Sequence, residues 1–72
     1  MSAKFKAIDR YLKKNTKEAL CVEQSDNGYV AYIFFISYGD LYIHEEFNAT
    51  GKSSEIAISE LNNIIRKEEK EQ

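Results

Sequence analysis

A run of aromatic and β-branched side chains in the middle of this 72-residue chain constrains its fold more than any other feature. Residues 29–38 read Tyr-Val-Ala-Tyr-Ile-Phe-Phe-Ile-Ser-Tyr, a composition that favours the pleated conformation of a β-strand. Asn27-Gly28 precedes the run and Gly39-Asp40 follows it. An Asn-Gly pair between apolar runs is typical of a tight hairpin whose two turn residues take positive φ. We therefore expect a central strand with an antiparallel neighbour on each side.

The segments on either side of this run have the pattern of strands. Within residues 18–24, Leu20 and Val22 alternate with Cys21 and Glu23, which is the period of two expected for a strand. Residues 41–47 form the third predicted strand. In the later segment, we expect Leu41, Ile43 and Phe47 to share one face of the sheet. The three strands would form an antiparallel meander with the aromatic run in the middle.

Amphipathic helices are expected at both ends of the chain. Phe5, Ile8 and Leu12 follow the spacing of one helical face within residues 3–14. Residues 54–69 carry a second apolar stripe, formed by Ala57, Ile58, Leu61, Ile64 and Ile65. The predicted fold class is therefore α+β, with the order α-β-β-β-α and a three-stranded antiparallel sheet flanked by an N-terminal and a C-terminal helix.

The chain has no proline and shows no linker or repeat, which predicts a single domain over residues 1–72. A polar tail over about 67–72 is expected to fray. We expect both helices to cover one face of the sheet, because a single small sheet has one core. The alternative, with one helix on each face, stays open.

The central strand is apolar on both faces, so helices on one face would leave an aromatic patch on the other. Such patches usually mark interaction sites, and a second copy in a twofold homodimer or another partner would cover this one. Oligomerisation would also reinforce a small core, since the lone Cys21 cannot form a disulfide within the chain. The residues expected at this dimer or partner interface are Tyr32, Phe34, Tyr38 and Tyr42.

The charges are divided unevenly along the chain, although they sum to only −2. Residues 1–20 have a net charge of +4, whereas residues 21–50 contain no Lys or Arg. The acidic side chains of this central block are Glu23, Asp26, Asp40, Glu45 and Glu46. The sequence therefore predicts an acidic sheet beside a basic first helix.

No residue pattern predicts catalysis, a cofactor or a metal. His44 is the only histidine, and neither a nucleophile motif nor a Gly-rich oxyanion loop accompanies it. Cys21 lacks the helix N-terminus or positive charge that activates a thiol. The acidic residues lack the spacing of a calcium loop, and residues 51–54 lack the first glycine of a phosphate-binding loop. We therefore expect a protein that is not an enzyme and needs no cofactor.

The order of elements and the segment from Gly51 to Leu61 resemble the double-stranded-RNA-binding domain. This resemblance implies a module that grips phosphates with lysines at the start of its last helix, where Lys52 stands. The chain departs from the family where Glu55 lies within that cluster and where Asp26-Asn27-Gly28 replaces a proline-containing loop. In this alternative, the nucleic-acid-binding residues are Lys6, Arg10, Lys13, Lys14 and Lys52.

In size, acidity and lack of catalytic motifs, the chain is also similar to small phage-encoded proteins that mimic DNA. Alternate residues on a strand lie about 6.6–7 Å apart, a scale comparable to the spacing of phosphates along one DNA strand. This resemblance implies an inhibitor or adaptor whose acidic residues occupy the basic surface of a DNA-binding protein. We favour it over direct nucleic-acid binding, because phosphate contacts need Lys or Arg. A purely structural dimer also stays open.

The sequence has no apolar run near the ~20 residues needed to span a membrane. It also begins without the long apolar stretch of a secretory signal. We therefore expect a cytoplasmic location, in the cell or in a host cell, and no membrane partner.

Overall fold

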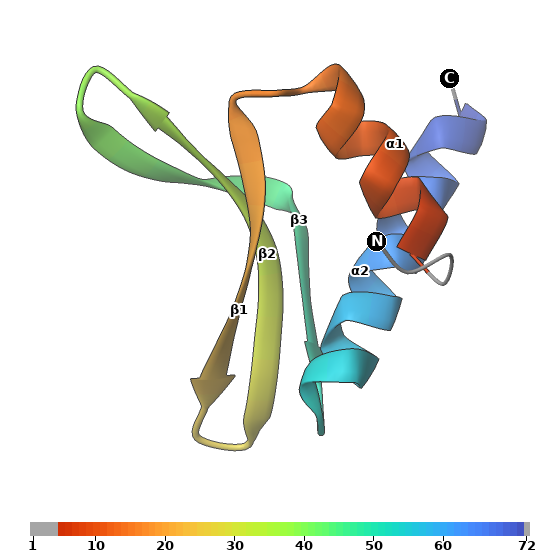
Figure 1. Ribbon diagram of the computed structural model, residues 1–72. Coiled ribbons are helices and arrows are strands. Elements are labelled where there is room, and N and C mark those ends of the chain that lie inside the picture. Colours follow the sequence, from red (N-terminus) through yellow and green to blue (C-terminus); the bar gives the residue numbers. More distant parts are fainter. Residues whose placement is uncertain (1–4, 72) are drawn as a thin grey trace.

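The computed structural model describes residues 5–71 and shows a three-stranded sheet with two helices (Figure 1). The strands form one antiparallel sheet in the order β1-β2-β3. This confirms the predicted α+β class and the α-β-β-β-α order. The elements are α1 (Lys6–Lys14), β1 (Glu18–Ser25), β2 (Gly28–Ser37), β3 (Asp40–Gly51) and α2 (Ser54–Glu71). The first two residues of the predicted N-terminal helix, 3–4, and residue 72 of the expected tail lie outside the described residues.

Both helices cover the same face of the sheet, as expected (Figure 1). α2 packs against β2 and β3, and α1 packs against α2. The largest fully buried side chains come from α1, β2 and α2, and they are Ile8, Ile33, Leu61 and Ile65. Burial of these side chains away from water supplies the main driving force for packing the helices on the sheet.

A buried hydrogen bond fixes α1 on α2. The backbone N–H of Ile8 lies in the first turn of α1, where helical N–H groups lack a partner within the helix. It donates to Oδ1 of Asn62 at 3.1 Å, and Asn62 is buried. α2 continues through Glu71, so most of the segment expected to fray as a polar tail is helical.

The first hairpin turn is displaced from the predicted position. Ser25 pairs with Gly28, so the turn residues are Asp26 and Asn27 rather than Asn27 and Gly28. Gly28 has a φ of 149°. A Cβ atom there would collide with the carbonyl oxygen of Gly51, which explains why the position needs glycine.

The second hairpin turn has positive φ at both central residues, which is the conformation that we expected for the first turn. Ser37 pairs with Asp40, which leaves Tyr38 and Gly39 in the turn instead of Gly39 and Asp40. Their φ angles are 52° and 82°, and positive φ at both central residues is the requirement of a type I′ turn. A tyrosine rarely adopts this conformation.

An irregularity in β3 overturns one prediction about the faces of the sheet. Tyr32 pairs with Asn48, but Phe34 pairs with Ile43, so residues 44–47 stand opposite a single residue of β2. β3 therefore has three more residues than β2 in this stretch. Because three is odd, the side chains of β3 on the two sides of the irregularity alternate out of step, and each set lies on the opposite face from the one that regular alternation would give it. The prediction that Leu41, Ile43 and Phe47 share a face is wrong, because only Phe47 enters the core.

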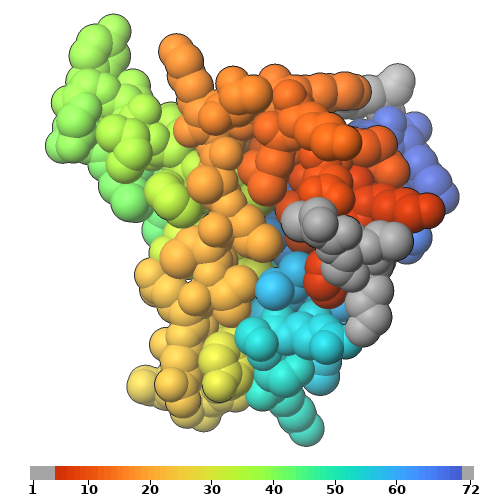
Figure 2. All heavy atoms as spheres, in the orientation of Figure 1, coloured from red at the N-terminus to blue at the C-terminus, as the bar shows by residue number. Residues whose placement is uncertain are grey.

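The distal part of the β2–β3 hairpin, residues 34–43, bends away from the helices (Figure 1). We call this segment the hairpin arm. In the space-filling view it stands out from the body of the molecule (green in Figure 2). Among the described residues, one large exposed apolar side chain lies on α2, and the rest lie on the arm. Those on the arm are Ile36, Tyr38, Leu41, Tyr42 and Ile43.

Candidate protein-binding site

The face of the sheet opposite the helices, here called the open face, is almost uncharged. Its side chains alternate along each strand with those of the core. Glu23, at the β1 edge, is its one charged member in the regularly paired part of the sheet. The apolar and aromatic members are Ala19, Cys21, Val30, Tyr32, Phe34, Ile36, Leu41 and Ile43.

Tyr32 is fixed in the floor of the open face. Its hydroxyl donates to Oε1 of Glu23 at 2.6 Å, and its ring lies edge-on to Phe34 with centroids 6.4 Å apart. Hydrogen bonding to the Cys21 thiol and to Glu23 raises the pKa of Tyr32 well above its ordinary value. Tyr32 is only 8% exposed, so it supports the open face but offers little contact area itself.

The four aromatic residues expected at one interface lie on different surfaces. Tyr32 and Phe34 belong to the open face, and Tyr38 stands fully exposed at the tip of the arm. Tyr42 lies on the reverse side, because it pairs with Phe35 and stacks on it with ring centroids 5.5 Å apart. Ile36 and Leu41, which pair with each other on the open face, were not among the residues expected at the interface. Alternation with Phe34 indicates the face of Ile36, whereas the face of Leu41 follows from its pairing with Ile36.

The reverse side of the arm holds a shallow cleft of about 420 Å³, which we call the acidic cleft. His44 stacks on Phe47 with ring centroids 4.4 Å apart, and the rings of Phe47 and Tyr11 of α1 are nearly perpendicular with centroids 5.0 Å apart. These contacts fix one wall of the cleft to the core. The residues that line it are Phe35, Tyr42, Ile43, His44, Glu45 and Glu46.

The two carboxylates of the acidic cleft, Glu45 and Glu46, are exposed. The irregular backbone that carries them is fixed by two hydrogen bonds. Asn48 Nδ2 donates to the Glu45 carbonyl oxygen at 2.8 Å, and the Glu46 N–H donates to Nδ1 of His44 at 3.4 Å. Between Lys17 and Lys52, the sequence has no Lys or Arg to neutralise them. Carboxylates beside aromatic rings attract guanidinium and ammonium groups.

The structure divides the predicted acidic residues into two groups. Asp40, Glu45 and Glu46 lie on β3, with Asp40 next to the tip of the arm. Glu23 lies on the open face, where Tyr32 binds it, and Asp26 lies in the first turn. The strand register places the two turns at opposite ends of the sheet. The five carboxylates therefore do not form a single row.

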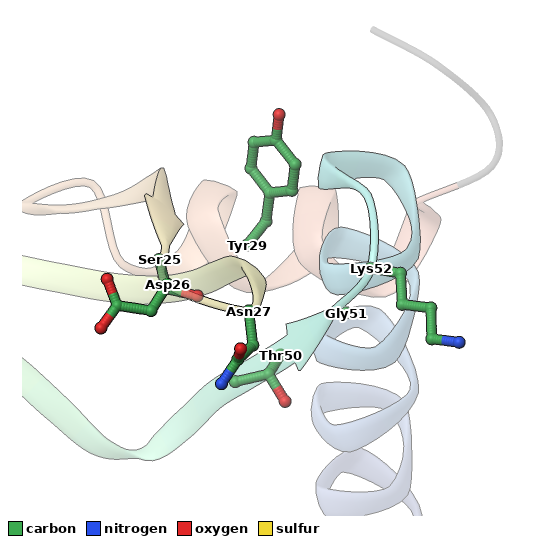
Figure 3. Close-up of a pocket in the computed structure, with 7 residues that line it drawn as sticks. All are labelled: Ser25, Asp26, Asn27, Tyr29, Thr50, Gly51 and Lys52. Atoms are coloured by element: carbon green, nitrogen blue, oxygen red, sulfur yellow. The ribbon is translucent and has the colours of Figure 1, made fainter.

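A second hollow, of about 540 Å³, lies beside the first turn (Figure 3). It is lined by Ser25, Asp26, Asn27, Tyr29, Thr50, Gly51 and Lys52. The Asp26 and Lys52 side chains point to opposite sides, and Tyr29 points away from both (Figure 3). Its polar groups do not converge on one point, as a ligand or catalytic site requires.

The predicted basic residues are also divided. Arg10 donates two hydrogen bonds to Glu69, from Nε to Oε2 at 3.1 Å and from Nη2 to Oε1 at 2.8 Å. Lys6, Lys13 and Lys14 are exposed on α1. Lys52 precedes α2, at the opposite end of that helix from Glu69. A phosphate backbone would therefore meet the lysines of α1 without Arg10, unless the pair with Glu69 broke, and Lys52 lies on a separate part of the surface.

Among residues 5–71, no group of three or more His, Cys, Asp or Glu side chains is placed to hold a metal ion. Within the same residues, neither helix has the length and apolar character to cross a membrane. No protein family, curated protein or solved structure matches this chain.

Proposed function

We propose that the protein is a non-enzymatic inhibitor or adaptor that occupies the basic surface of a nucleic-acid-binding protein. The observation that carries this proposal is the acidic cleft. It combines two exposed carboxylates, Glu45 and Glu46, with the exposed ring of Tyr42, in a sheet without a single Lys or Arg.

The chemistry of the acidic cleft suits Lys and Arg side chains of such a surface. A cation over an aromatic ring gains about 0.5–1 kcal/mol at an exposed site, and an exposed ion pair gains up to about 1 kcal/mol. Several contacts of this size are needed for stable binding, and Asp40 extends the acidic edge along β3 toward the tip. Complementary charge also speeds association and makes it sensitive to salt.

The division of the basic residues favours this function over direct binding of RNA or DNA. Phosphate contacts dominate the affinity of proteins for nucleic acids. Arg10 is engaged by Glu69, and Lys52 is separated from the lysines of α1. The basic face of α1 is thus left with three exposed lysines from the predicted set, Lys6, Lys13 and Lys14.

Capture from a nuclease-treated bacterial lysate tests the proposal. The tagged chain is compared with the double variant Glu45→Gln/Glu46→Gln and with the control Asp26→Asn/Glu60→Gln. The control changes the net charge by the same amount at exposed sites away from the cleft. We expect the chain and the control to retain a basic nucleic-acid-binding protein that the cleft variant loses. Equal retention by both variants would contradict the proposal, and retention of nucleic acid alone from a parallel lysate without nuclease would favour the α1 lysines.

A further inference from the structure

The apolar side of the hairpin arm forms one continuous patch. Phe34 pairs with Ile43, and Ile36 pairs with Leu41, so these four side chains are adjacent on the open face. The helices lie on the other side of the sheet and do not reach them (Figure 1). The patch continues toward β1 through half-buried apolar side chains, among them Cys21 and Val30.

The chemistry of this patch calls for an apolar occupant. Its four side chains carry no charge, and the nearby carboxylates of the acidic cleft belong to the irregular segment and the reverse side of the arm. A nucleic acid or a basic surface gains nothing from covering uncharged aliphatic groups. A matching apolar face, by contrast, would remove both surfaces from water.

The arm exposes much of the area that an interface between two copies needs. Ile36, Leu41 and Ile43 are 54%, 56% and 52% exposed. With about 200 Å² for a fully accessible large side chain, these three present on the order of 300 Å² per copy. Two copies would bury roughly 600 Å² through them, and the half-buried members of the open face, among them Phe34 and Val30, contribute the further area toward the roughly 1,000 Å² of a biological interface.

We propose that a second copy of the chain covers the open face in a twofold homodimer joined through the apolar side of the hairpin arm. A patch that is apolar throughout is self-complementary, which is the condition for a closed twofold interface. The two sheets would pack face to face, as in a β-sandwich. The acidic clefts would stay exposed on the reverse sides of the arms. Ile43 borders both the patch and the acidic cleft. The variants that test the dimer and the proposed function change other residues, so either proposal can fail without the other.

Sedimentation equilibrium over a range of concentrations tests the dimer. We expect the chain to reach twice its mass of 8.3 kDa. The double variant Ile36→Ser/Leu41→Ser should weaken dimerisation by at least about tenfold, because both side chains lie beyond the core. The control Ile56→Ser removes an exposed apolar side chain of α2 and should leave the dimer intact. A chain that stays monomeric into the millimolar range would overturn the proposal.

A second measurement covers the case in which the variants misfold. In a mixture of isotope-labelled and unlabelled chains, isotope-filtered nuclear Overhauser contacts should connect methyl groups of Ile36 and Leu41 across copies. Contacts confined to α1 or α2 would place the dimer elsewhere and overturn the proposal. Salt should leave the dimer intact or strengthen it, because it screens the repulsion between two copies that each have a net charge of −2. Dissociation of the dimer by added salt would contradict an apolar interface.

Discussion

Arg10 on α1 and Glu69 on α2 are joined by two hydrogen bonds across 59 residues of sequence, with the shorter N–O distance at 2.8 Å. This pair ties the last turns of α2 to α1. It also engages the arginine of the predicted nucleic-acid-binding set within the protein. The pair thus contributes to the fold and at the same time weakens the case for α1 as a phosphate-binding surface.

The Arg10–Glu69 pair should make stability depend on acidic pH. Hydrogen bonding to Arg10 lowers the pKa of Glu69 in the folded state. The contribution of the pair to the free energy of unfolding is therefore complete above the unfolded carboxyl pKa of about 4.3. It is lost as the pH falls through the lower pKa that Glu69 has in the folded state. We expect Glu69→Gln to lower the melting temperature slightly at neutral pH, since the pair is exposed, and to make no difference in strong acid. Thermal unfolding of both proteins from about pH 3 to pH 7 checks this, with Glu60→Gln as control. A difference independent of pH would contradict it.

Two tyrosines should make the fold sensitive to alkaline pH. Burial and a hydrogen bond to Glu18 at 2.6 Å raise the pKa of Tyr11. Hydrogen bonds to Cys21 and Glu23 raise the pKa of Tyr32. The folded state thus holds these protons more tightly, so stability is complete below the unfolded pKa of about 10 and falls as pH rises above it.

Phenylalanine variants separate this effect from general alkaline unfolding. We expect Tyr11→Phe and Tyr32→Phe each to make the loss of stability above about pH 10 less steep, as measured by urea unfolding at several pH values. Tyr38→Phe, at the exposed tip, serves as control. If the pH dependence of both variants equals that of the unmodified chain, the hydrogen bonds to Glu18 and Glu23 do not form in solution.

Phe47 and Leu41 lie on the same strand, β3, but they should contribute very differently to the stability of the fold because of the irregular segment between them. Phe47 is 5% exposed, stacks on His44 and contacts Tyr11. Phe47→Ala should therefore destabilise the fold by about 3–5 kcal/mol. Leu41→Ala should change the stability of the monomer by no more than about 0.5 kcal/mol. Chemical unfolding of the monomer measures both changes in the free energy of unfolding. Similar losses of stability in the two variants would contradict the irregular segment, because they would place Leu41 and Phe47 on the same face of the sheet.

The two turn glycines should differ in their tolerance of a side chain. Both have positive φ, which disfavours any residue with a Cβ atom by about 1–2 kcal/mol. At Gly39 the added Cβ meets open space, whereas at Gly28 it meets the backbone of Gly51. We expect Gly28→Ala to lower the melting temperature clearly more than Gly39→Ala does. The reverse order would contradict the close approach of β2 and β3 at that end of the sheet.

The elements could be predicted because their signals are local and repeated. The aromatic run of β2 and the apolar stripe of α2 each span several turns or pleats, so tertiary packing had no reason to override them. The face of Phe47 could not be predicted, because it depends on residues 44–47 standing opposite one residue of β2. A shift by an odd number of residues leaves no mark in the alternation on either side of it.

The candidate site was predictable only in part for the same kind of reason. Glu45 and Glu46 stand out in a sequence block without Lys or Arg. The position of Tyr42, by contrast, follows from its pairing with Phe35, which requires the turn at Tyr38-Gly39. With a turn one residue later, Tyr42 would pair with Ser37, which lies on the same side of the sheet as Phe35, so the predicted turn loses the stacking on Phe35 but not the side of the sheet.

Competition with duplex DNA for the captured partner tests the central claim most directly. The partner is immobilised, and release of the bound chain is measured as DNA is added at two salt concentrations. If the acidic cleft occupies the nucleic-acid site, DNA should displace the chain, and binding should weaken as salt rises. If the chain and DNA bind the partner together without competition, the chain does not occupy the nucleic-acid-binding surface and the proposed function is wrong.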